Sequence, residues 1–81
     1  MIKDFLAIIG ANANDPQSEA FSSAYSSLSS AVEMKSFLPD PVLWSEFERL
    51  IWKLQMLDET PSQPDITRLQ LLANQLSPRR N

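Results

Sequence analysis

The positions of six prolines and a single glycine constrain this chain more than any other feature. They fall between segments of helical periodicity rather than inside them. Because proline interrupts helices and glycine often ends them, this layout predicts helices joined by short loops. Alternation of apolar and polar residues, the mark of a half-buried strand, is absent. The sequence therefore predicts an all-α fold, a small antiparallel bundle of three main helices plus a short N-terminal helix.

The N-terminal half contains two predicted helices. The first covers residues 2–9 and is expected to end at Gly10, since glycine adopts positive φ without steric cost. The second is expected to begin at Asp15, whose carboxylate can accept from free amides, with Pro16 in the first turn. It runs to about Lys35. Its apolar stripe has the three- and four-residue steps of an amphipathic helix and comprises Phe21, Ala24, Tyr25, Leu28, Ala31 and Val32.

The C-terminal half contains two further helices. Asp40 followed by Pro41 predicts a capped start for the third helix, which is expected to end near Asp58. The fourth is expected to begin at a capping box formed by Ser62 and Asp65. The apolar stripe of the third helix comprises Leu43, Phe47, Leu50, Leu54 and Leu57, and Trp44 and Ile51 widen it. The apolar stripe of the fourth helix comprises Ile66, Leu69, Leu72, Ala73 and Leu76.

The chain has 81 residues, which suits one small domain. We expect a single helical domain over residues 1–78 and a polar tail over 79–81. Ten of the sixteen residues from 42 to 57 are apolar. So much apolar surface on a small domain predicts a homodimer or a required partner.

Composition excludes several classes of chemistry. The chain contains neither cysteine nor histidine, which removes disulfide scaffolds, thiolate and imidazole metal sites, and His-based catalytic triads. One glycine cannot build a phosphate-binding loop. The net charge of −3 argues against nucleic-acid binding. We therefore expect no enzymatic activity, no cofactor and no metal.

The N-terminus resembles a secretory signal only faintly. Its apolar run, residues 5–9, is shorter than the roughly 7–15 residues that a signal needs. No apolar segment approaches the ~18 residues that would span a bilayer. The sequence predicts a cytoplasmic protein without a membrane partner.

Two large apolar residues of the third predicted helix fall outside its core stripe. At about 100° per residue, Trp52 and Met56 lie on the polar side, among Ser45, Glu48 and Arg49. Tryptophan is favoured as an anchor and methionine as an adaptable filler at protein interfaces. We expect these five residues to bind a partner. The alternative is that a neighbouring helix or the N-terminal segment covers this side.

These observations favour a non-enzymatic protein–protein interaction module, such as an adaptor, a small chaperone-like protein or a regulator. Its partner would be another protein, a second copy, or both. One alternative is an inhibitor or immunity-type protein whose acidic surface masks a basic site. Another is a small nucleic-acid-binding regulator that uses Arg49, Lys53, Arg79 and Arg80.

Overall fold

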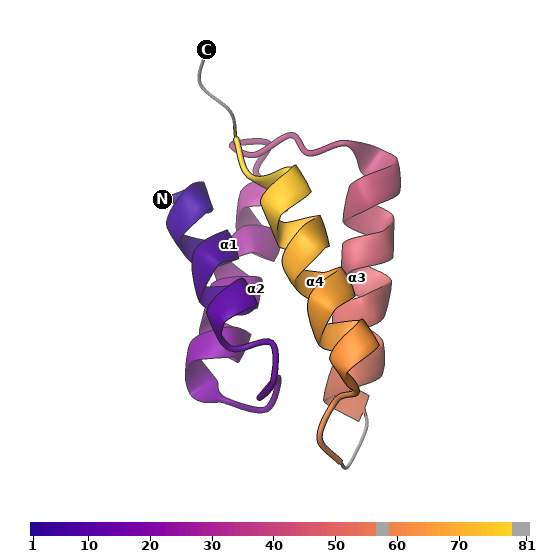
Figure 1. Cartoon of the computed structure of the whole chain (residues 1–81). Helices are drawn as coiled ribbons and strands as arrows, with labels where there is room; N and C mark the ends of the chain where they lie inside the picture. Colours follow the sequence, from indigo (N-terminus) through magenta and orange to yellow (C-terminus); the bar gives the residue numbers. More distant parts are fainter. Residues whose placement is uncertain (57–58, 79–81) are drawn as a thin grey trace.

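The computed structural model describes residues 1–56 and 59–78. Four helices form this part of the chain: α1 (Ile2–Ala11), α2 (Glu19–Glu33), α3 (Pro41–Met56) and α4 (Gln63–Leu76). Successive helices alternate in direction (Figure 1), and α1 packs against α2 and α4, while α4 also packs against α3. The described residues contain no strand, so the predicted all-α bundle is confirmed.

The core is apolar, and no polar or charged side chain is buried among the described residues. Aromatic rings join α2 to α3. Trp44 stacks on Tyr25 with ring centroids 6.4 Å apart, and it contacts Phe37 edge-on and Phe47 at 6.0 and 5.5 Å. The most deeply buried large side chains come from all four helices and comprise Leu6, Ile9, Phe21, Leu28, Phe47, Ile51, Leu54, Leu69 and Leu72.

The start of α3 is as predicted, but the start of α2 is not. The carboxylate of Asp40 accepts from the amides of Val42 and Leu43 at 2.9 and 3.1 Å. In contrast, the N-cap of α2 is Ser18, whose hydroxyl accepts from the amide of Phe21 at 3.2 Å. The predicted cap at Asp15 is wrong because a turn intervenes, in which the Asp15 carbonyl accepts from the amide of Ser18 at 3.0 Å.

The end of α1 also differs from the prediction. Gly10 lies inside the helix and does not have positive φ. The C-cap is Asn12, whose side-chain amide donates to the carbonyl of Ile8 at 2.8 Å. In addition, Gln70 of α4 donates to the carbonyl of Gly10 at 3.0 Å. Backbone amides of Asn12 and Ala13 also donate to these two carbonyls, at 3.0 and 3.4 Å. The end of the helix is thus satisfied without a left-handed glycine.

The left-handed residue lies instead at the end of α2. Lys35 has a φ of 61°. The amide of Ser36 donates to the carbonyl of Ala31 at 2.9 Å, and that of Lys35 donates to Val32 at 3.1 Å. This pair of bonds is a Schellman motif, formed here without glycine.

At the start of α4 the predicted N-cap residue is correct, but its hydrogen bond is absent. Ser62 is the N-cap and makes no side-chain capping bond. The carboxylate of Asp65 lies instead 3.5 Å from the ammonium of Lys53 on α3. The predicted end of the third helix near Asp58 and the expected tail at 79–81 lie outside the described residues.

Candidate docking face on α3

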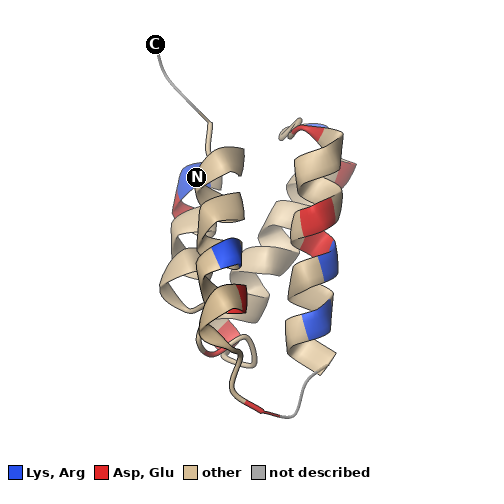
Figure 2. Cartoon of the chain, turned by 45° about the vertical axis from the view of Figure 1, so that its right-hand side comes forward, with Lys and Arg blue, Asp and Glu red and all other residues tan. Residues whose placement is uncertain are grey.

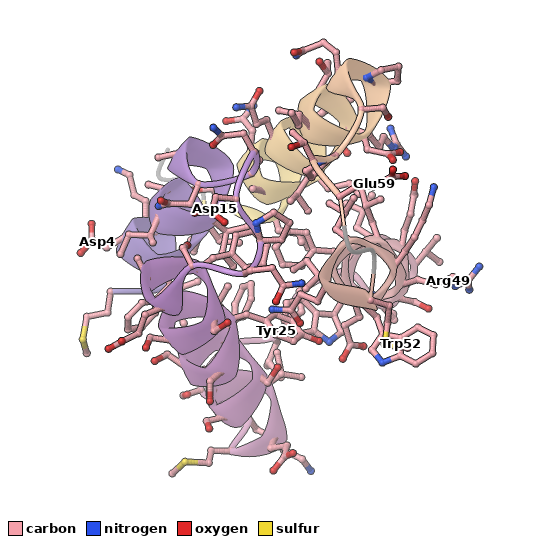
Figure 3. The ribbon with its side chains drawn as sticks, turned by 90° about the horizontal axis from the view of Figure 1, so that it is seen from below. Asp4, Asp15, Tyr25, Arg49, Trp52 and Glu59 are labelled. Carbon is pink, nitrogen blue, oxygen red and sulfur yellow. The ribbon has the colours of Figure 1, made fainter. Side chains whose placement is uncertain are left out.

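Trp52 and Met56 lie on the outer side of α3. Their side chains are 67% and 68% exposed, whereas Trp44 on the same helix is 8% exposed. Figure 3 shows Trp52 and Arg49 pointing away from the other helices. No helix in the described part of the chain covers this side, and the core is complete without it.

The exposed residues on this side follow one another at alternating steps of three and four. This spacing places them on one stripe of a helix, opposite the core. We define the docking face by Val42, Ser45, Arg49, Trp52 and Met56, all of which are exposed. Val42, 74% exposed, was missed at the sequence level, although its position seven residues before Arg49 was a usable signal.

A hollow lies along the N-terminal half of the docking face. It has a volume of about 560 Å³ and is lined by Pro41, Val42, Ser45, Glu46 and Arg49. Ser45 has the smallest side chain of these five residues. The face therefore combines two projecting apolar groups at one end with space around a serine towards the other.

Glu48 faces α2 and is not part of the docking face. It is half-buried, and its carboxylate accepts from the hydroxyl of Tyr25 at 3.4 Å. Burial raises the pKa of Tyr25, Ser29 lowers it through a hydrogen bond, and the nearby charge of Glu48 raises it further. The net direction is upward. Glu48 thus links α2 to α3 beside the predicted partner-binding residues.

Charged residues of both signs lie along α3 (Figure 2). Glu46 accepts from the guanidinium of Arg68 on α4, through Nε at 2.8 Å and also through Nη2. Lys53 pairs with Asp65, as described above. Both α3 residues therefore take their partners from α4.

The residues proposed for nucleic-acid binding do not form one described cluster. Arg49 is exposed, and Lys53 lies beside a carboxylate. Arg79 and Arg80 lie outside the described residues. Within residues 1–56 and 59–78, no group of three or more acidic side chains is placed to hold a metal ion. None of the described helices has the length and apolarity needed to cross a membrane.

Comparisons of the chain with protein-family models, with curated proteins and with solved structures gave no match. The docking face and its surroundings are therefore the features of the molecule that bear on its function.

Proposed function

We propose that the protein is a non-enzymatic interaction module that binds another polypeptide chain through the docking face, as an adaptor or regulator. One observation carries this proposal. Trp52 and Met56 leave about two-thirds of their side-chain surface in water, on a helix whose opposite side already completes the core. Burying such surface against a partner is favourable, and an exposed tryptophan is a common interface anchor. The predicted cytoplasmic location belongs to this proposal.

The charges around the face support apolar docking. Glu46 and Lys53 lie along one edge of it with opposite signs, and each has a partner on α4. Arg49, on the face itself, is a cation. A protein that masks a basic site would be expected to present carboxylates at its anchor, so the neighbourhood of Trp52 favours the adaptor over the inhibitor.

Fluorescence quenching tests whether the face is covered on binding. The chain has two tryptophans, and Trp44 is buried, so iodide quenching reports mainly on Trp52. Quenching is expected for the isolated protein and protection when a partner is present. Trp52→Ala is expected to abolish partner capture, whereas Leu71→Ala, a 44% exposed apolar residue on α4, leaves it intact. Equal capture by wild type and Trp52→Ala would overturn the proposal.

A further inference from the structure

We propose that the partner at the docking face is a second copy of this chain, with the two α3 helices antiparallel about a twofold axis between Leu50 and Ile51. This inference names the occupant of the docking face and so rests on the proposed function. Residues of the docking face have the spacing of alternating a and d positions of a heptad. In a two-helix coiled coil these positions form the contact line, or seam, between the helices. Arg49 is then an a position and Trp52 a d position.

The proposed axis brings complementary groups to the same height. In an antiparallel pair, a residue that lies a given number of positions before the twofold axis in one copy is opposite the residue the same number of positions after it in the other. Arg49 therefore meets Trp52 of the second copy, and the guanidinium can lie on the indole ring as a cation–π contact. Ser45 meets Met56 of the second copy, so the methionine enters the hollow beside the serine. The twofold axis repeats both contacts.

Charges beside the seam match in this register. Glu46 and Lys53 lie on the same edge of the docking face, and the axis places Glu46 of one copy within one helical turn of Lys53 of the other. Each already has a partner on α4. The dimer would therefore form a row of alternating charges running from Arg68 and Glu46 of one copy to Lys53 and Asp65 of the other. Such charges set register and orientation more than affinity.

The same charges disfavour the other arrangements. Sliding the pair by one heptad in one direction brings Glu46 of one copy within one helical turn of Glu46 of the other. Sliding it in the other direction brings Lys53 within one helical turn of Lys53 of the other copy. A parallel pair places Arg49 against Arg49 in the seam. Like charges at these positions destabilise helix pairs, so charge complementarity selects the antiparallel pair with its axis between Leu50 and Ile51.

Sedimentation velocity on the full chain tests this proposal. We expect a concentration-dependent dimer between about 10 µM and 1 mM, because a contact between two short helix faces belongs to the small, weak class of interfaces. E46K and K53E each bring like charges together and are expected to weaken the dimer at least about tenfold. An equimolar mixture of the two variants restores opposite charges across the axis and is expected to dimerise like wild type. Leu71→Ala, away from the seam, is the matched control.

Disulfide trapping tests the orientation, since the chain has no native cysteine. In the proposed pair, S45C and M56C lie at one level, so a mixture of the two variants is expected to form the mixed disulfide. Each variant alone is expected to stay reduced, because the two identical cysteines of such a pair lie about 16 Å apart along the helix axis. Formation of S45C or M56C homodimers instead of the mixed species would overturn the antiparallel arrangement.

The outcomes separate this inference from the proposed function. Self-pairing is overturned if the wild-type chain remains monomeric at about 1 mM. It is also overturned if wild type dimerises but the mixture of E46K and K53E stays monomeric. If the monomeric wild type then captures a binding protein that Trp52→Ala does not, self-pairing fails and the docking function survives. If the two variants show no difference in capture, both fail. Circular dichroism of each variant checks that it is folded.

Discussion

Trp44 and Trp52 lie eight residues apart on α3, about 80° apart around the helix axis, and this rotation separates the core from the solvent. Trp44 is 8% exposed and contacts three aromatic rings, whereas Trp52 is 67% exposed. One helix thus carries one tryptophan that holds the fold together and one that is available to a partner.

Alanine substitutions are expected to separate these two roles. Trp44→Ala removes ring contacts and leaves a cavity, so the free energy of unfolding should fall by about 3–5 kcal/mol. Trp52→Ala, measured where the chain is monomeric, should change it by less than about 0.5 kcal/mol and weaken the complex by about 2 kcal/mol or more. Denaturant midpoints and binding titrations measure the two effects. A strongly destabilised Trp52→Ala would show that Trp52 is structural.

Capping substitutions are expected to distinguish the true helix starts from the apparent one. Asp40→Ala and Ser18→Ala each remove an acceptor of a backbone amide, so each should lower stability by about 1 kcal/mol. Asp15→Ala removes no such acceptor and should stay within about 0.5 kcal/mol of wild type. The measurement is the urea midpoint of each variant. A loss at Asp15 equal to that at Asp40 would contradict the assigned start of α2.

Lys35 offers a stabilising substitution. Its φ of 61° is costly for a residue with a Cβ atom. Lys35→Gly removes this cost and should raise the free energy of unfolding by up to about 1 kcal/mol, despite the greater freedom of glycine in the unfolded chain. Lys35→Ala keeps the Cβ atom while removing the charge and serves as the control. Equal thermal midpoints for the glycine and alanine variants would contradict the backbone explanation.

Tyr25 predicts a pH dependence at the alkaline end. Its pKa is raised above the ordinary value of 10.0, mainly by burial and also by Glu48. The folded state therefore retains the phenolic proton to higher pH than the unfolded state. This contribution to stability is fully present below pH 10 and is lost as the pH rises through the folded pKa.

Tyrosinate absorbance reports this titration directly, since Tyr25 is the single tyrosine of the chain. Glu48→Gln removes the neighbouring negative charge and should lower the pKa of Tyr25 part of the way towards its ordinary value, leaving the shift due to burial. A folded-state titration at or below pH 10 would contradict the raised pKa.

Apolar periodicity was sufficient to predict the helices and their buried sides. Apolar residues spaced three and four apart share one side of their helix, and that side faces the core. Examples are Phe21, Leu28, Phe47 and Leu69, all of which are buried. The same geometry placed Trp52 outside the core stripe, but its exposure also required that no other helix cover that side, which the structure shows for the described residues.

Helix ends were less predictable because they depend on partners distant in sequence or on competing local turns. Gly10 resembles a terminator, but hydrogen bonds from Asn12 and Gln70 let the helix continue past it. Asp15 resembles a cap, but Ser18 takes that role after an intervening turn. The ion pairs of α3 with α4 were also missed, since nothing in the spacing along α3 indicates which helix lies beside it.

The turn before α2 has a consequence for the far end of α3. The side-chain amide of Gln17 donates to the backbone carbonyl of Gln55 at 2.6 Å, and the side chain of Gln55 donates to the carbonyl of Pro16 at 3.3 Å. The first of these bonds satisfies a carbonyl in the last turn of α3, where helices ordinarily fray. Met56 is the next residue, and Trp52 is one turn earlier. A partner therefore meets an apolar end that is already preorganised, and less conformational entropy is lost on association.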